Sequence, residues 1–113
     1  MDTNSTTLWT SGYSVLGRYR LEAIMGQGGF AQVWRATDVV LSRPVAIKVL
    51  HPTVTPTDQK RFVAEARILA KFNSPSVVAV YDAGIDSGRA FLVMEFIEGL
   101  TLATLIRKAP IPL

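Results

Sequence analysis

A glycine-rich segment and a lysine in an apolar strand are the residues of this sequence whose types suggest chemistry. The segment runs Gly26-Gln27-Gly28-Gly29-Phe30-Ala31 and is followed by Val33. Backbone N–H groups bind a phosphate when they approach it closely, and glycine permits both that approach and the unusual dihedral angles it requires. Because most glycine-rich turns are only turns, the segment needs support from its neighbours before it indicates a phosphate site.

Three phosphate-binding patterns can be compared with this segment. A Walker A loop requires a Gly-Lys pair, and the chain contains none. A Rossmann fingerprint requires a helix after the glycines and an acidic residue about 20 positions further on. Here a strand-like run with valine and tryptophan follows, and residues 46–52 hold no acid. A glycine loop between two antiparallel strands, with Val33 two positions past its end, resembles the protein-kinase arrangement.

Lys48 stands in the apolar run Val45-Ala46-Ile47-Lys48. Alternation along a strand places Ala46 and Lys48 on one face and Val45 and Ile47 on the other. A lysine among apolar neighbours is costly unless an anionic group meets its ammonium. The other interpretation is a lysine on an edge strand whose ammonium reaches water, and the run alone does not decide between them.

Glu65 is the candidate anionic partner. It lies in the middle of a predicted helix, one turn before Leu69, so we expect it to project towards the core-facing side. An ion pair with Lys48 would hold the lysine where phosphates can reach it. The alternative is a surface pair with Arg61, four positions earlier, worth only a few tenths of a kcal/mol.

The elements that must position these groups follow from the hydrophobic pattern. We predict strands over residues 18–25, 32–38, 45–50, 77–81 and 89–96, and a helix capped by Thr57 or Asp58 that ends near Phe72. Its apolar positions are Phe62, Ala66, Leu69 and Phe72. Short links favour antiparallel hairpins, and Asp82-Ala83-Gly84 is interpreted as part of a turn. The prediction is an α+β fold, a five-stranded antiparallel sheet with one main helix, plus the start of a further helix at 101–108.

Composition bounds the class of protein. The chain has 113 residues, of which 49% are hydrophobic and 19% charged, which favours one small folded domain over disorder. The net charge of +3 comes from scattered Lys and Arg with no run longer than two, so no nucleic-acid surface is predicted. The absence of cysteine excludes a disulfide framework, a thiolate metal site and a cysteine nucleophile, and it agrees with a cytoplasmic location.

The N-terminal segment, residues 1–17, is polar and rich in Thr and Ser. We expect a flexible leader, because it has neither the basic start nor the apolar core of a signal peptide. Apolar stretches such as Ala90–Met94 are too short to span a bilayer, so no membrane segment is predicted.

Taken together, the motifs resemble one family. Five segments occur in order at the expected separations: G-Q-G-G-F-A-Q-V at 26–33, V-A-I-K at 45–48, R-F-V-A-E-A at 61–66, S-P-S-V-V-A-V-Y-D at 74–82 and L-V-M-E-F-I-E-G at 92–99. They look like the N-terminal lobe of bacterial eukaryotic-like (Hanks-type) serine/threonine protein kinases. The resemblance covers residue 17 to about residue 108, with 18–98 as the ATP-binding lobe and 99–113 as the hinge and the truncated start of a C-terminal-lobe helix.

The resemblance implies roles for individual residues. The lid over the ATP triphosphate would comprise Gly26, Gln27, Gly28, Gly29, Phe30 and Ala31. Val33 and Ala46 would form the roof of the adenine pocket, with Met25 at its edge and Met94 as the gatekeeper. Lys48 would contact the α- and β-phosphates, held by Glu65. Backbone groups of Glu95 and Ile97 would bond the adenine edge. Leu69 and Val80 would belong to the apolar spine that links the two lobes.

The sequence lacks the segments that complete such a kinase. The family takes its catalytic base and Mg²⁺ ligands from His-Arg-Asp and Asp-Phe-Gly segments, whereas the single histidine here, His51, precedes Pro52. We therefore assign no metal ligand in this chain and expect it to be inactive alone, with protein substrates bound through a C-terminal lobe that the sequence does not contain. The alternative is a free-standing kinase-like lobe that acts as an interaction or dimerisation module through its exposed lobe face.

Overall fold

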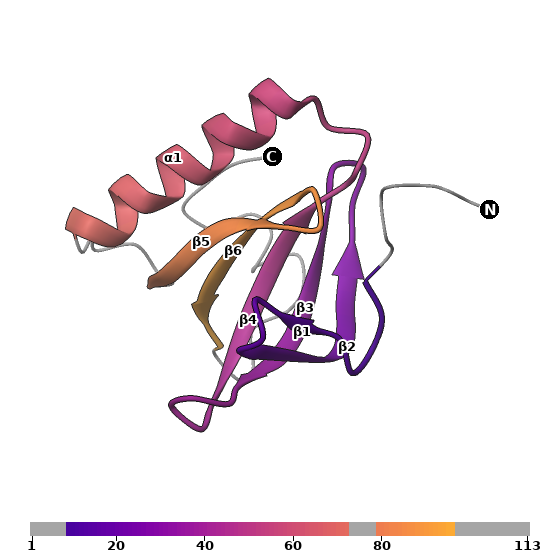
Figure 1. Ribbon diagram of the computed structural model, residues 1–113, viewed down its shortest axis with the longest axis vertical. Helices are drawn as coiled ribbons and strands as arrows, with labels where there is room; N and C mark the ends of the chain where they lie inside the picture. Colours follow the sequence, from indigo (N-terminus) through magenta and orange to yellow (C-terminus); the bar gives the residue numbers. More distant parts are fainter. Residues whose placement is uncertain (1–8, 73–78, 97–113) are drawn as a thin grey trace.

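Six antiparallel strands and one helix make up the described part of the chain, residues 9–72 and 79–96 of a computed structural model (Figure 1). The elements are β1 (Ser14–Val15), β2 (Tyr19–Gln27), β3 (Ala31–Asp38), β4 (Arg43–Leu50), α1 (Pro56–Phe72), β5 (Val80–Asp86) and β6 (Arg89–Glu95). They form one sheet in the order β1-β2-β3-β4-β6-β5. The predicted α+β class with one main helix is confirmed, with six strands where five were expected. The predicted helix at 101–108 lies outside the described residues.

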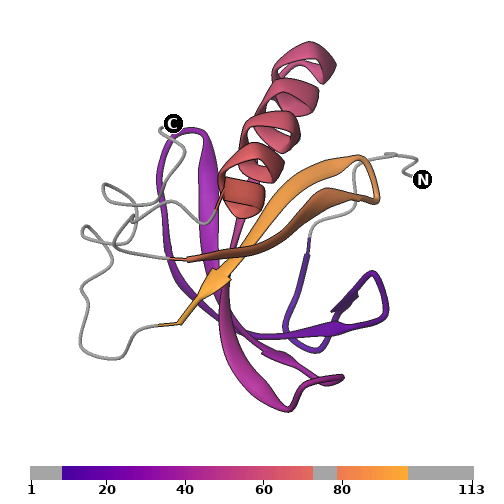
Figure 2. The same ribbon diagram turned by 90° about the vertical axis from the view of Figure 1, so that its left-hand side faces the viewer.

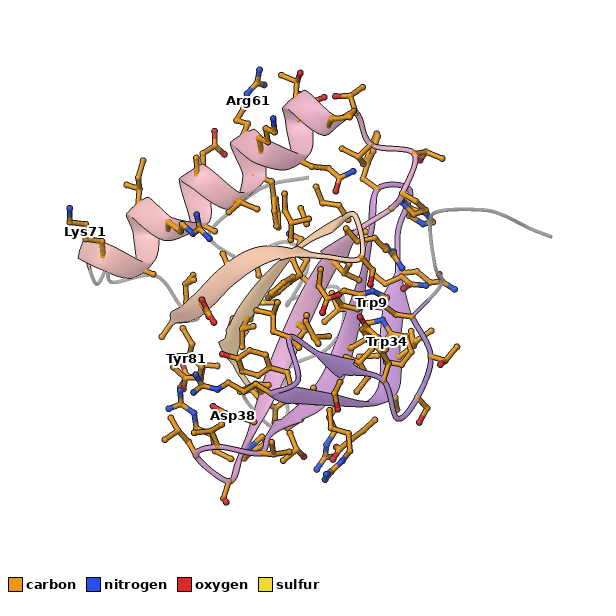
Figure 3. The ribbon with its side chains drawn as sticks, in the orientation of Figure 1. Trp9, Trp34, Asp38, Arg61, Lys71 and Tyr81 are labelled. Carbon is orange, nitrogen blue, oxygen red and sulfur yellow. The ribbon has the colours of Figure 1, made fainter. Side chains whose placement is uncertain are left out.

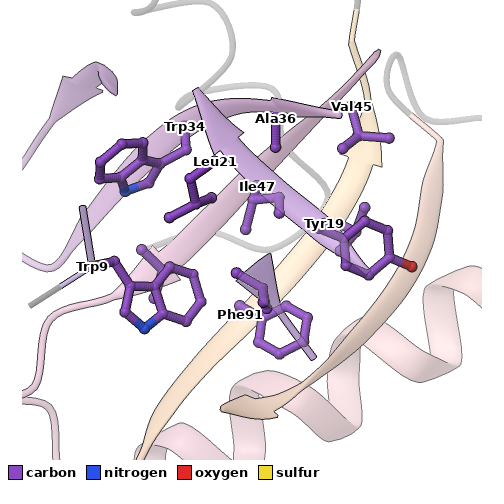
Figure 4. Packing of buried hydrophobic residues seen from close by; sticks show 11 residues of the cluster. Trp9, Tyr19, Leu21, Trp34, Ala36, Val45, Ile47 and Phe91 are labelled. Atoms are coloured by element: carbon purple, nitrogen blue, oxygen red, sulfur yellow. The ribbon is translucent and has the colours of Figure 1, made fainter. Parts of the chain in front are cut away.

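The sheet buries apolar side chains on both faces, because successive side chains of a strand point to opposite sides. On one face, residues of β3, β4 and β6 pack beneath Trp9, Tyr19 and Leu21 (Figure 4). On the other face, Leu50 and Leu92 pack against Phe62 of α1. The helix therefore covers only one face of the sheet, where it lies against β5 and β6 (Figure 2).

Helix α1 begins earlier than the sequence suggested. The amide of Asp58 donates to Thr55 Oγ1 at 3.1 Å, so Thr55 caps the helix and Pro56 is its first residue. The predicted cap at Thr57 or Asp58 is wrong, because proline is well suited to the first helical position, which needs no amide donor. Phe62 and Ala66 are buried as expected, whereas the side chains of Leu69 and Phe72 lie outside the described part.

Residues 9–17 differ from the flexible leader expected there. Trp9 is 4% exposed and Val15 is fully buried. The Tyr13 hydroxyl and the Leu16 amide each donate to the Asp86 carboxylate at 2.6 Å, which attaches the segment to the β5–β6 hairpin. The apolar area of the aromatic side chains outweighs the polar Ser and Thr around them. Residues 1–8 lie outside the described part.

The β5–β6 hairpin turns later than predicted. Its turn is Ser87-Gly88, both with positive φ (53° and 76°), which suits a two-residue hairpin loop. The segment Asp82-Ala83-Gly84 is therefore part of strand β5, and its interpretation as a turn is wrong. Gly84 has a packing reason to be glycine, since a Cβ atom there would lie 3.3 Å from the ring of Phe91.

Candidate functional site

Lys48 lies in β4, a central strand, between β3 and β6. Its register partners are Val33 on β3 and Leu92 on β6, so the three side chains share the face that α1 covers. The lysine is 0% exposed, and its burial lowers its pKa to about 8. A solvent-reaching lysine on an edge strand is thereby excluded. The ammonium nevertheless remains mostly protonated at pH 7, because that pH lies below its pKa.

The residues predicted to roof an adenine pocket lie on the same face. Ala46 is two positions from Lys48 along β4 and is opposite Met94 on β6. Ala46 and Met94 are 0% exposed and Val33 is 1% exposed. The register thus brings four of the predicted site residues together as one buried apolar surface with a single cation in it, while their roles remain predictions.

The glycine-rich loop is the tip of the β2–β3 hairpin. Gly26 pairs with Val33 and Gln27 with Gln32, and the Gly28 amide donates to the Ala31 carbonyl at 2.8 Å. A Cβ atom placed on Gly28 or Gly29 would meet nothing within 4 Å beyond its chain neighbours, and neither residue has a positive φ. The fold itself therefore does not require glycine at these two positions, in contrast to Gly84.

The tip of this loop is open to solvent. Phe30 is 60% exposed, and Gln27, Gly28 and Gly29 are exposed, whereas Met25 at the loop's edge is half-buried. The loop is joined to the end of β4 through the His51 amide, which donates to the Phe30 carbonyl at 2.7 Å. The loop is thus fixed by the pairing of β2 with β3 and by the bond to His51, while Gly28 and Gly29 remain accessible to solvent.

Glu65 lies on the exposed side of α1, although the sequence led us to expect a core-facing side chain. It forms none of the ion pairs found among the described residues. Arg61, which points away from the sheet (Figure 3), pairs instead with Asp58 at 3.6 Å. The reason is that Phe62, Val63 and Ala66 define the buried stripe of the helix, and Glu65 falls beside that stripe. Its pairing with Lys48 stays a prediction, which requires α1 to turn or shift.

The hinge residues are described only in part. The Glu95 amide donates to the Ala79 carbonyl at 2.9 Å, and Glu95 Oε1 accepts from the Ala79 amide at 3.3 Å. The Glu95 carbonyl is therefore the backbone group of this residue that can serve an adenine edge. Ile97 lies outside the described residues.

Sequence reasoning missed two groups of buried polar residues. Asp38 is fully buried, and Arg18 donates to both of its carboxylate oxygens at 3.0 and 2.9 Å, which holds the pKa of Asp38 at about 2. Gln59 and Arg89 are buried where β4 leads into α1. The one signal for these buried residues in the sequence is that Arg89 directly precedes the apolar run Ala90–Met94. An arginine in that position could equally be exposed to solvent at the end of the strand.

A hollow of about 320 Å³ lies between α1 and β5, lined by Lys60, Val63, Ala64, Arg67 and Ile85. None of the predicted nucleotide-contacting residues lines it. Over residues 9–72 and 79–96, no three His, Asp or Glu side chains are grouped so that they could hold a metal ion. Within the same ranges, no helix has the length and apolar content needed to cross a membrane.

A curled antiparallel sheet with one helix on the face of a buried lysine, beside a glycine-rich hairpin, is the architecture of the N-terminal lobe of a protein kinase. The protein kinase domain family matches residues 19–112. The chain therefore belongs to the protein kinase domain family, and its relatives are bacterial serine/threonine kinases.

Among those relatives, the DNA damage-responsive serine/threonine-protein kinase RqkA of Deinococcus radiodurans is 43% identical over 108 residues. That alignment covers 92% of this chain and 16% of RqkA. Serine/threonine-protein kinase PknL of Mycobacterium tuberculosis is 46% identical over 98 residues, or 84% of this chain and 25% of PknL. The chain thus spans a quarter or less of the length of these relatives.

Solved structures agree on the fold. The kinase domain of Mycobacterium tuberculosis PknI superposes with a TM-score of 0.70 at 24% identity, covering 82% of this chain and 38% of that one. The apo form of PpkA-294 gives a TM-score of 0.67 at 29% identity, covering 91% and 43% of the two chains. In each case the match corresponds to less than half of the other structure.

Proposed function

We propose that this chain is the ATP-binding lobe of a serine/threonine protein kinase that transfers the ATP γ-phosphate to Ser or Thr of protein substrates. One observation carries the proposal. Gly28 and Gly29 are free of any packing or dihedral requirement for glycine, and they lie in the hairpin next to the strand that bears Lys48. Neither packing nor backbone conformation explains these glycines. A phosphate that must approach backbone N–H groups closely would explain them, because any larger side chain would obstruct it.

Lys48 supplies the matching charge. Its burial among apolar side chains lowers its pKa to about 8, so it is still a cation at neutral pH, and an anion brought close to it would be attracted in a medium of low dielectric. Val33, Ala46 and Met94 give the apolar surface on which a planar base can lie. The lobe therefore offers groups for the base and for the phosphates of one nucleotide.

The Mg²⁺ that accompanies ATP in phosphoryl transfer neutralises charge on the phosphates. Among the described residues, no three His, Asp or Glu side chains are grouped so that they could hold a metal ion. We infer that its protein ligands and the catalytic base belong to a C-terminal lobe, so that this chain alone binds ATP weakly and transfers no phosphate.

Titration with a fluorescent ATP analogue, displaced by ATP, tests the proposal. We expect Lys48→Met and Gly29→Val each to weaken binding by about tenfold or more, because one removes the cation and the other obstructs the backbone. The control is Lys60→Met, which removes an exposed lysine of α1 and should leave affinity unchanged. Equal binding by all four proteins, or transfer of phosphate by the isolated chain, would contradict the proposal.

A further inference from the structure

The corner where β4 leads into α1 contains a buried arginine. Arg89, the first residue of β6, is 1% exposed. Its Nε and Nη2 atoms both donate to the Leu50 carbonyl, at 3.1 and 3.0 Å. Leu50 is the last residue of β4, two positions after Lys48. One guanidinium thus holds the carbonyl at which the lysine-bearing strand ends.

A buried glutamine completes the corner from the helix. Gln59 is 6% exposed, its Nε2 donates to the Val54 carbonyl at 2.9 Å, and its Oε1 accepts from the Ala90 amide at 2.8 Å. It therefore joins the first turn of α1 both to the link that precedes the helix and to β6. Arg89 is itself the first residue of β6, and by alternation its side chain lies on the face of Phe91, whereas Gln59 bonds the next residue, Ala90, from the helix.

Burial of the Arg89 guanidinium is unfavourable in free energy. Its Nη1 atom is buried with no hydrogen-bond partner within the described structure, and burial lowers the pKa of Arg89. Its guanidinium lies 5.5 Å from the ring centre of Trp9, and that ring in turn packs against Phe91 (Figure 4). An aliphatic side chain would fill this space without leaving a buried donor unsatisfied. The feature that only the guanidinium provides is the fixed position of the Leu50 carbonyl.

The same corner holds the glycine-rich loop. His51 follows Leu50, and its amide donates to the Phe30 carbonyl at 2.7 Å. Three parts of the candidate site therefore meet within six residues of chain, 50–55: the end of the lysine strand, the side of the glycine-rich loop and the cap of α1 at Thr55.

We propose that Arg89 and Gln59 are positioning residues that set the placement of α1, and with it Glu65, relative to Lys48 and the glycine-rich loop. This inference rests on the proposed ATP-binding function for its effect on nucleotide affinity. With the corner fixed, the link at residues 51–55 is the pivot about which the start of α1 can move relative to the sheet. Loss of either side chain frees the start of the helix without removing any group that contacts the nucleotide.

Hydrogen exchange measured by mass spectrometry on the whole chain tests the positioning. We expect Gln59→Leu and Arg89→Met to speed exchange of the amides of residues 51–63 by about tenfold, while amides of β2 and β3 change little. Gln59→Glu, which keeps the acceptor for the Ala90 amide, should give a smaller increase. The control is Arg67→Met, an α1 arginine that donates to the Ala83 carbonyl away from the corner.

Nucleotide affinity, measured in parallel, distinguishes this inference from the proposed function. We expect Gln59→Leu and Arg89→Met to weaken ATP binding several-fold while Arg67→Met leaves it unchanged. Faster exchange throughout the chain would show a general stabilising role and overturn the inference, as would unchanged exchange at 51–63 or faster exchange there with unchanged affinity. If the unmodified chain binds no ATP, the proposed function fails, and the exchange data still decide whether these residues position α1. If Arg89→Met does not fold, Arg89→Lys and Gln59→Glu serve in its place.

Discussion

Replacing Lys48 with methionine should change how the stability of the fold depends on pH. The lysine has a pKa of about 8 when folded, against 10.5 for an unperturbed lysine. Between these values the unfolded chain binds more protons than the folded chain, so the free energy of unfolding rises with pH over this window. The difference of 2.5 pKa units at about 1.4 kcal/mol per unit gives an upper bound of roughly 3–4 kcal/mol.

Methionine has no such titration, so the sign of the effect is fixed. Below pH 8 the native protein carries the full cost of the buried charge, and above pH 10.5 it carries none. The advantage of Lys48→Met should therefore shrink by up to roughly 3–4 kcal/mol between pH 7 and pH 10.5. Methionine also alters packing, but by an amount that does not depend on pH. The test is therefore how the difference in the free energy of unfolding between the two proteins changes with pH, and not the size of that difference at any one pH.

Urea unfolding of both proteins at pH 7, 8, 9 and 10.5 measures this change. Trp9 and Trp34 are 4% and 3% exposed, so their fluorescence should report unfolding. Tyr19 does not interfere, because burial and the nearby Asp82 raise its pKa to about 12. A difference between the two proteins that stays constant from pH 7 to pH 10.5 would refute the conclusion that burial lowers the pKa of Lys48.

Three further predictions concern the fold. Thr55→Ala should lower stability by about 1 kcal/mol and speed amide exchange in the first turn of α1, because the cap on Asp58 is lost; unchanged exchange there would count against Thr55 as the cap. Trp9→Ala should cost about 3–5 kcal/mol in urea unfolding, whereas a change below 1 kcal/mol would mean that the segment is not part of the core. Asp38 adds stability above pH 3.8 that is lost as the pH falls towards 2, so Asp38→Asn should flatten acid unfolding followed by fluorescence.

The sequence predicted the fold class and the grouping of the site on one face because both depend on alternation. Residues two apart in a strand share a face, so Ala46 and Lys48 had to lie together wherever the strand was placed. The sheet then brought Val33 and Met94 beside them through register, which the sequence only implied by resemblance.

What the sequence could not predict depends on contacts between distant residues. The buried position of Trp9 depends on Phe91 and Arg89, which lie about eighty positions away in the chain and have no local signal. Similarly, Glu65 is at helical spacing from Leu69, but the orientation of α1 is decided by how Phe62 and Ala66 meet the sheet. A helix with several apolar positions can turn by a few tens of degrees without violating its pattern.

The central position of β4 has a consequence for motion. Strands β1 and β5 form the two borders of the sheet, and borders open first in thermal fluctuations because half of their backbone groups lack a neighbouring strand. Lys48 lies on β4, which is separated from β1 by β2 and β3 and from β5 by β6. The amine is thus carried by one of the two innermost strands of the sheet, β3 and β4. We therefore expect adjustment to a bound molecule to come from the glycine-rich hairpin and from α1 rather than from the strand that bears Lys48.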